Sequence, residues 1–353
     1  MSRKILLVGG AGYVGSVLTH ELLERGYAVR ILDRLYFGDI GLRDHRDRVE
    51  LLVGDMRTIE SSVLKDVDAV INVGGLSNDP TAEYNPKANY EMNTLAAKKL
   101  ADLCVANGVQ RYIFASSCSI YDRGVGDDSR DVLLDEETTV DPRAAYSGSK
   151  REAEKLLLDM AGSDFCPVIL RKGTIYGFSP RMRYDLVVNT FVKDALSKGY
   201  LNIHYGGEMW RPLVEVRDVA RAYIACLRAD EAKVKEQIFN VSFTNFRISE
   251  LALRVREAFR SLGYDIDIRP DYGYRGVRSY RVSSAKIQRV LDFHPKVTVE
   301  ESVQHMVEQI RAYGYHDFSN PRYYNIHWMR LLEEAQKVIA VTGSVFEAPG
   351  SEE

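Results

Sequence analysis

Short apolar runs alternate with longer segments of helical apolar spacing through the first half of the chain. Lys4–Val8 is an apolar run followed by glycines, which predicts a buried strand. Tyr13–Arg25 has apolar residues three and four apart and is followed by Gly26, which predicts a helix with a glycine stop. The pattern continues with expected strands at Ala28–Leu32, Leu51–Val53, Ala69–Val73, Arg111–Ser116 and Val168–Arg171, and expected helices at Asn89–Val105 and Ser147–Met160. This alternation predicts an α/β fold with a doubly wound parallel sheet.

The alternation loosens after about residue 175. Short strand-like runs at Phe239–Val241 and Ile266–Ile268 lie between amphipathic segments, and Thr298 with Glu301 forms a capping-box signature. The expected helices are Tyr184–Ser197, Val216–Leu227, Ile248–Ser261, Val299–Tyr313 and Ile326–Val341. We interpret this half as a smaller α/β lobe that carries substrate contacts.

The composition narrows the possible classes of protein. The 353 residues are 45% hydrophobic and 27% charged with a net charge of -3, which is ordinary for a globular protein and gives no reason to expect nucleic-acid binding. No apolar run approaches the roughly 18 residues that span a bilayer, and glycines interrupt the apolar N-terminal run that a signal peptide would need. The four cysteines are irregularly spaced, so we expect neither a metal site nor disulfides, and we expect a cytoplasmic protein.

A glycine-rich loop follows the first expected strand and precedes the first expected helix. Gly9 permits a tight turn, Gly12 lets the backbone approach a pyrophosphate, and Gly15 allows close packing of helix and strand. The N-terminus of the following helix supplies free N–H groups to phosphates. A flexible turn is the alternative interpretation, but the position between strand and helix favours a dinucleotide site.

Asp33 ends the second expected strand, where a carboxylate accepts hydrogen bonds from the adenosine ribose. It would repel a 2′-phosphate, so the sequence favours NAD over NADP. The neighbouring Arg34 can weaken that repulsion, or it is a solvated surface charge, and this alternative stays open.

A tyrosine and a lysine stand four residues apart at the start of an expected helix. Tyr146 and Lys150 therefore share one helix face, and a nearby ammonium favours the phenolate that acid/base chemistry needs. Ser117 follows the Arg111–Ser116 strand, at the sheet edge where such folds bind ligands. Each element alone also has an ordinary structural interpretation, a chance helix pair and a polar strand end.

Seven motifs in order resemble the extended short-chain dehydrogenase/reductase family, especially UDP-galactose 4-epimerase and its relatives. The resemblance covers roughly residues 3–315 and is strongest before residue 180. The motifs are GGAGYVG at Gly9–Gly15, GDM at Gly54–Met56, VINVGGLS at Val70–Ser77, Asn93, FASSCSIY at Phe114–Tyr121, YSGSK at Tyr146–Lys150 and RPLVEVRDVA at Arg211–Ala220.

The resemblance implies a role for each matching residue. Ser117, Tyr146 and Lys150 are the implied catalytic triad. The implied NAD-binding residues are Gly9, Gly12, Tyr13, Val14, Gly15, Asp33, Asp55, Met56, Gly74, Asn93, Tyr146 and Lys150. The expected substrate contacts are Ser77, Ser117, Ser119, Thr174, Arg183, Asn189, Arg211 and Arg278. Arg211 is implied to hold the pyrophosphate of a nucleotide-diphosphate sugar, although a structural salt bridge is an alternative. The implied second phosphate contact is Arg278 or Arg275, and the motif spacing does not decide between them.

The resemblance also divides the chain. It implies a Rossmann-type NAD-binding domain over residues 1–175, an interleaved substrate-binding lobe over 176–342 and a flexible tail over 343–353. Relatives dimerise through the helices expected at Asn89–Val105 and Ser147–Met160, which implies a homodimer. Leu95, Leu100, Leu103, Leu156 and Leu157 would supply that interface unless they face the sheet.

The residues after the catalytic hydroxyl narrow the reaction. Relatives that are 4,6-dehydratases carry an Asp-Glu pair where this chain has Cys118 and Ser119, and serine cannot replace a carboxylate. Oxidation and reduction at one carbon remain. The hypothesis is an NAD-dependent nucleotide-sugar epimerase acting at C4 through a 4-keto intermediate. A keto-sugar reductase that uses NAD(P)H stays open, as does a non-catalytic NAD-binding sensor. A nucleotide-sugar dehydratase is a less favoured alternative.

Overall fold

A seven-stranded parallel sheet forms the centre of the protein. The computed structural model describes residues 2–121, 132–273 and 279–343. The strand order is β11-β7-β5-β4-β1-β2-β3, and every pairing in this sheet is parallel. The strands are β1 (Lys4–Val8), β2 (Ala28–Asp33), β3 (Glu50–Val53), β4 (Ala69–Asn72), β5 (Arg111–Ser117), β7 (Cys166–Lys172) and β11 (Gln237–Val241). The predicted doubly wound α/β fold is confirmed.

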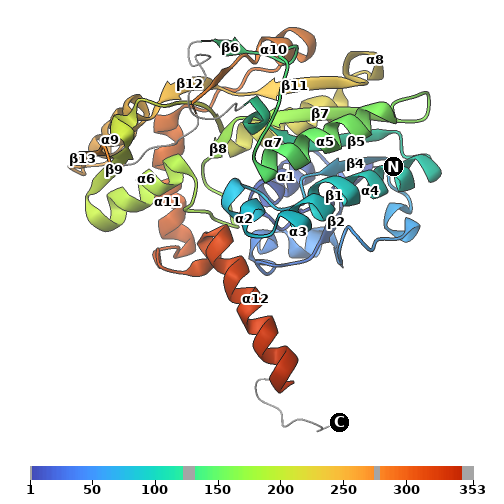
Figure 1. The fold of residues 1–353 in the computed structure, drawn as a ribbon, viewed down its shortest axis with the longest axis horizontal. Coiled ribbons are helices and arrows are strands. Elements are labelled where there is room, and N and C mark those ends of the chain that lie inside the picture. Colours follow the sequence, from blue (N-terminus) through green and yellow to red (C-terminus); the bar gives the residue numbers. More distant parts are fainter. Residues whose placement is uncertain (1, 122–131, 274–278, 344–353) are drawn as a thin grey trace.

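Helices cover both faces of the sheet (Figure 1). On one face α1 (Tyr13–Glu24) packs against α7 (Val216–Arg228) over a buried apolar cluster. On the other face α4 (Ala96–Ala106) packs against α5 (Ala145–Asp159) over a second cluster. Because α7 and β11 come from the second half of the chain, the two halves share one sheet.

The helix expected at Asn89–Val105 is built in three pieces. The chain forms α3 (Pro86–Tyr90), a π-helical turn over Glu91–Leu95, and then α4. Within the expected dimer set, Leu100 and Leu157 are fully buried towards the sheet, whereas Leu95 is exposed.

A second group of elements lies beside the sheet, on the left in Figure 1. Its core is formed by α6 (Val187–Lys198), α9 (Ile248–Ser261) and α11 (Val299–Tyr313), and the expected capping box of Thr298 and Glu301 begins α11. Small sheets flank these helices: β8 (Thr174–Tyr176) with β10 (Trp210–Glu215) and β12 (Thr244–Arg247), and β9 (Tyr200–His204) with β13 (Asp267–Asp271). The remaining short elements are α2 (Asp79–Tyr84), β6 (Leu133–Leu134), α8 (Glu231–Val234), β14 (Arg281–Val282) and α10 (Ala285–Leu291).

The sequence patterns located the long helices but missed several short elements. The spacing did not indicate β8, β9, β10 or β12, because strands of three to six residues carry too few positions for a period. Helix α6 begins three residues later than expected, at Val187, since Asp185 is engaged by the Arg183 guanidinium before the helix starts.

The last helix, α12 (Asn325–Thr342), projects from the body of the molecule in Figure 1, and its N-terminal half contacts the rest of the chain. The Trp328 indole N–H donates to the Tyr36 carbonyl at 2.5 Å, and Tyr84 of α2 bonds Glu333. Of the tail expected at 343–353, residues 344–353 lie outside the described residues.

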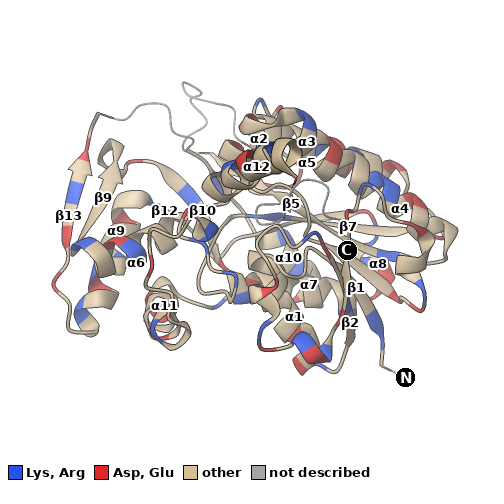
Figure 2. Cartoon of the chain, turned by 90° about the horizontal axis from the view of Figure 1, so that it is seen from below, with Lys and Arg blue, Asp and Glu red and all other residues tan. Residues whose placement is uncertain are grey.

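Charged residues of both signs are interspersed along the same elements, such as α4 and α9 (Figure 2). Within the described ranges, no helix is both long and apolar enough to cross a membrane.

Candidate active site

A cavity of about 440 Å³ runs along the carboxyl ends of the parallel strands and continues towards the second group of elements. Almost all the residues singled out from the sequence line it. They are Gly9, Gly12, Tyr13, Val14, Gly15, Asp33, Asp55, Met56, Gly74, Ser77, Ser117, Ser119, Tyr146, Lys150, Thr174, Arg183 and Arg211. One pocket therefore brings together residues from positions 9 to 211.

Two glycines of the loop between β1 and α1 are packed too closely against backbone to carry a side chain. A Cβ on Gly15 would lie 2.0 Å from the Gly9 carbonyl oxygen. Gly9 has a φ of +80°, and its Cβ would lie 2.8 Å from Gly74 in the loop after β4. Bare backbone beside a helix N-terminus leaves N–H groups open to a phosphate. The loop fits a dinucleotide pyrophosphate.

Asp33 is held at the end of β2 by its own backbone surroundings. The carboxylate accepts N–H groups from Ala11 at 3.0 Å and Leu35 at 2.8 Å. Burial raises its pKa, and these hydrogen bonds oppose that effect. Arg34 pairs with Asp55 at 2.8 Å, and Asp33 faces the cavity with no cation at ion-pair distance in the part of the chain that the structure describes. This arrangement suits ribose hydroxyls.

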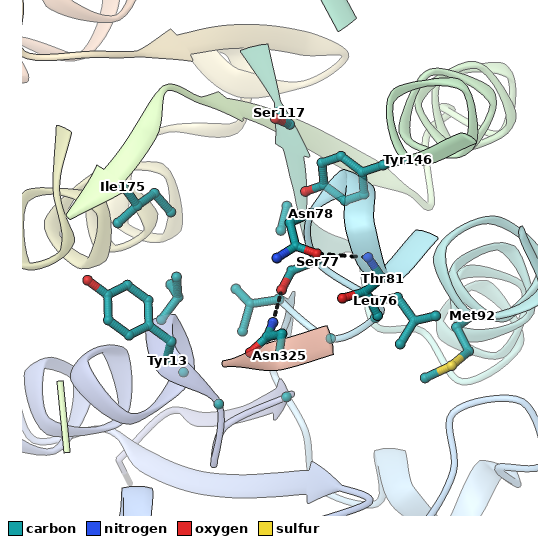
Figure 3. A pocket seen from close by; sticks show the side chains of 18 of the residues that line it. Tyr13, Leu76, Ser77, Asn78, Thr81, Met92, Ser117, Tyr146, Ile175 and Asn325 are labelled. Carbon is teal, nitrogen blue, oxygen red and sulfur yellow. Dashed lines mark hydrogen bonds between the residues drawn. The ribbon is translucent and has the colours of Figure 1, made fainter. Parts of the chain in front are cut away.

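Ser117 and Tyr146 approach the cavity from β5 and α5 (Figure 3). Lys150 lies one helical turn after Tyr146 and is buried, with its ammonium 4.8 Å from the centre of the Phe114 ring. Burial lowers the pKa of Lys150 to about 8. Among the described residues, no carboxylate lies within ion-pair distance of this ammonium.

A buried ion pair anchors α5 to the sheet beneath these groups. Glu154 lies one turn beyond Lys150 and accepts two hydrogen bonds from the Arg171 guanidinium, at 2.9 and 2.7 Å. Ser116, one residue before Ser117, also donates to Glu154, at 2.5 Å. The pair links α5, β5 and β7, and so fixes the position of Tyr146 relative to Ser117.

Lys172 is a pocket residue that the sequence did not single out. It ends β7 and pairs in register with Ser117, so the two residues stand side by side at the sheet edge. Its ammonium contacts the Tyr223 hydroxyl at 3.2 Å and, within the described ranges, lies near no carboxylate. Burial, and then repulsion by Lys150, lowers its pKa well below the ordinary value. A lysine in an apolar strand carries no spacing signal, so only the strand pairing reveals it.

Two expected contacts, Asn189 and Asn93, are not among the residues that line the cavity. Asn189 is fully buried and bonds the Tyr13 hydroxyl at 3.2 Å and the Arg183 carbonyl at 2.8 Å, so we correct its role from a substrate contact to a support of those residues. Asn93 lies behind the loop after β4 and donates to the Leu76 carbonyl at 3.0 Å. Arg278 lies outside the described residues, as does Arg275.

Two arginines of the segment after β8 form one wall of the cavity. Arg183 pairs with Asp185 through two hydrogen bonds, at 2.8 and 3.0 Å. Arg181 is only 3% exposed and donates to the side-chain oxygen of Asn325 at 2.6 Å. Burial, with repulsion by Arg183, lowers the pKa of Arg181 to about 9. The first residue of α12, Asn325, was not expected in the site, because nothing local marks it.

Residues 5–242 match the model of the NAD dependent epimerase/dehydratase family. The chain belongs to this family. It is an NAD-dependent nucleotide-sugar enzyme of the extended short-chain dehydrogenase/reductase type, as the sequence predicted, and the expected cofactor, NAD, is confirmed. The glycine loop and Asp33 would hold that cofactor.

Three similar proteins match this chain over almost their whole length. A UDP-N-acetyl-alpha-D-glucosaminuronate decarboxylase of Bacillus cytotoxicus is 25% identical over 328 residues, which are 88% of this chain and 98% of that protein. A putative UDP-glucose 4-epimerase of Methanocaldococcus jannaschii is 26% identical over 316 residues, 87% and 98% of the two chains. The structure of MoeE5 in complex with UDP-glucuronic acid and NAD is 25% identical with a TM-score of 0.72, and covers 88% of this chain and 99% of that one. The similar proteins thus include both epimerases and decarboxylases.

Proposed function

We propose that this enzyme is a nucleotide-sugar epimerase that acts at C4 through a transient 4-keto sugar. The observation that carries the proposal is the meeting of Ser117, Tyr146 and Lys150 on one cavity whose other end holds the glycine loop and Asp33. A hydride acceptor would thereby reach the C–H bond of one sugar carbon, and a proton acceptor would reach the hydroxyl on the same carbon.

In this proposal each side chain has one task. Tyr146 takes the proton from the C4 hydroxyl, and Ser117 holds the oxygen during that transfer. The Lys150 ammonium favours the charged form of Tyr146 across one turn of α5. Bound NAD supplies hydride uptake and return. Between the two hydride transfers the 4-keto sugar rotates, so that hydride returns to the opposite face of C4. Tyr146 then returns the proton to the oxygen.

The residues beyond Ser117 argue against a dehydratase. Cys118 is fully buried and its thiol donates to the Arg171 carbonyl at 3.1 Å. Burial raises the pKa of that thiol, so it is a poor proton donor to a substrate. Ser119 lines the cavity, and its hydroxyl is buried with no hydrogen-bond partner among the described residues. We propose that Ser119 bonds a sugar hydroxyl.

One observation favours a second candidate function, decarboxylation of a nucleotide-linked uronic acid. Among the described residues, no carboxylate lies at ion-pair distance from the Lys172 ammonium beside Ser117, and the C6 carboxylate of such a sugar would supply one. Oxidation at C4 then gives a β-keto acid, which loses carbon dioxide. The first step and its residues are the same in both candidates.

The remaining contacts follow the path of a nucleotide-diphosphate sugar. We propose that Arg211 of β10 binds the pyrophosphate, because a guanidinium fork matches phosphate oxygens and Arg211 reaches the cavity from the second group of elements. Ser77, Thr174 and Arg183 would line the sugar end. We further propose a cytoplasmic homodimer, for which the four free, buried cysteines and the exposed Leu95 are the support.

Two measurements on the purified enzyme test the proposal. Denaturation should release near-stoichiometric NAD, because an epimerase regenerates its cofactor in every turnover. NMR should then show UDP-glucose and UDP-galactose, or UDP-glucuronate and UDP-galacturonate, converging to one mixture from either side. Release of carbon dioxide with formation of a nucleotide-linked pentose would instead support the decarboxylase and contradict the epimerase. A protein isolated without nucleotide that reduces a 4-keto sugar once with NADPH would contradict both.

A further inference from the structure

Arg181 is a buried cation with an incomplete set of partners. Its Nη2 bonds the neutral amide of Asn325, its guanidinium stacks 3.6 Å from the centre of the Phe37 ring, and its Nε is buried with no partner among the described residues. Across the described residues, no carboxylate lies within ion-pair distance of the Arg181 guanidinium. A guanidinium taken out of water in this way is costly unless an anion binds to it.

The neighbouring carboxylates are already engaged. Asp185 accepts both hydrogen bonds of Arg183 and, in addition, the backbone N–H of Asn325 at 3.2 Å. Asp33 is held by the backbone N–H groups described above. Of the two guanidiniums in this wall of the cavity, only that of Arg183 is paired with a carboxylate at ion-pair distance among the described residues.

The position of Arg181 points to the anion that completes it. Gly41 touches the glycine-rich loop on one side and Arg181 on the other, because a Cβ on Gly41 would lie 2.5 Å from the Ala11 oxygen and 3.2 Å from the Arg181 Cβ. Arg181 lines the same cavity as Asp33 and the loop, so a dinucleotide held at these two places would have its pyrophosphate on the side of Arg181. A guanidinium fork suits two phosphate oxygens.

We propose that Arg181 binds the pyrophosphate of NAD, as a second hold beside the backbone of the glycine-rich loop. Asn325, at the start of α12, orients the guanidinium through its side-chain oxygen and is itself fixed by a 2.9 Å hydrogen bond to Ser77 (Figure 3). The C-terminal helix thus takes part in holding a cofactor whose main site lies at the other end of the chain. The proposal is independent of the reaction that follows.

Calorimetry with three ligands tests it. Arg181→Met should weaken binding of NAD and of ADP-ribose about 30-fold or more, the lower range for a buried charge pair, and change adenosine binding less than twofold. Arg322→Met, which removes an exposed arginine near α12, is the matched control and should leave all three affinities unchanged. Unchanged NAD affinity in Arg181→Met, or an equal loss for adenosine, would overturn the proposal.

If Arg181→Met does not fold, a second variant tests the same contact. Asn325→Asp places a carboxylate of nearly the same shape on the guanidinium, so the arginine is present but already paired. We expect NAD affinity to fall at least tenfold while thermal unfolding stays cooperative. Wild-type NAD affinity in this variant would contradict a direct contact between Arg181 and the pyrophosphate.

Discussion

Two sets of buried charged side chains lie within a few residues of one another and differ in their partners. Behind the cavity, Glu154 accepts hydrogen bonds from both Arg171 and Ser116. Along the cavity wall, Lys150 and Arg181 are buried and Lys172 is half-buried. Each lies beside an aromatic ring and, among the described residues, has no carboxylate at ion-pair distance. The paired set holds α5 on the sheet, whereas the unpaired set raises the free energy of the unliganded fold and is available to anionic ligands. Substitutions in the first set should reduce stability, and substitutions in the second should reduce function.

The largest effect on turnover is expected at Tyr146, whose charged form the Lys150 ammonium is proposed to favour. Tyr146→Phe removes the proton acceptor and should lower turnover roughly 10³-fold or more. NAD binding and the free energy of unfolding should change little, because the ring remains in place. Steady-state kinetics and the NAD content of the purified variant measure the two effects. Turnover within a few fold of wild type would remove Tyr146 from the mechanism.

Breaking the paired set should cost stability instead. Glu154→Gln leaves the Arg171 guanidinium buried without its carboxylate and should reduce the free energy of unfolding by about 3–5 kcal/mol. Urea unfolding measures the loss. Glu152→Gln, on the same helix and only partly buried, is the control and should change stability by less than about 0.5 kcal/mol. Equal effects of the two variants would show that the buried pair is not what holds α5.

Lys150→Met should act in the opposite direction on stability. The pKa of Lys150 is lowered from 10.5 to about 8 on folding, so the unfolded chain binds the proton more tightly. The resulting destabilisation is fully present below pH 8 and disappears as the pH rises from about 8 to 10.5. Its upper limit is about 3 kcal/mol.

At pH 7 the unliganded Lys150→Met variant should therefore unfold at higher urea than wild type, and the difference should vanish near pH 10.5. Turnover should fall sharply in the same variant. A variant less stable than wild type at pH 7 would mean that the ammonium has an anionic partner in the unliganded protein.

The smallest effect is expected for an exposed pair, which sets the baseline for the comparison. Lys98 and Asp102 bond across one turn of α4 at 2.7 Å, and both side chains are about half exposed to solvent. A double-mutant cycle with alanine should give a coupling of about 0.3–0.5 kcal/mol that declines with added salt. A coupling above about 1 kcal/mol would remove the distinction between buried and exposed pairs.

Local sequence determined the parts of this protein that depend on a few adjacent residues. The period of apolar residues located β1, α1, α9 and α11, because each face that a strand or helix buries is marked at its own spacing. The glycines at Gly9–Gly15 marked the proposed phosphate loop, where a Cβ at Gly9 or Gly15 would collide with backbone atoms. The tyrosine and lysine four apart marked the proposed catalytic face of α5.

The tertiary structure alone decided which distant residues share the cavity. Lys172 stands beside Ser117 because β7 pairs with β5, and no spacing along the chain reports a strand pairing. Arg181, Asn325 and Ser77 meet across 248 positions through two hydrogen bonds. Asn189 had the residue type of a substrate contact, yet packing placed it behind the wall. Side-chain periodicity is a property of one element, whereas a partner for a buried charge depends on the packing of several.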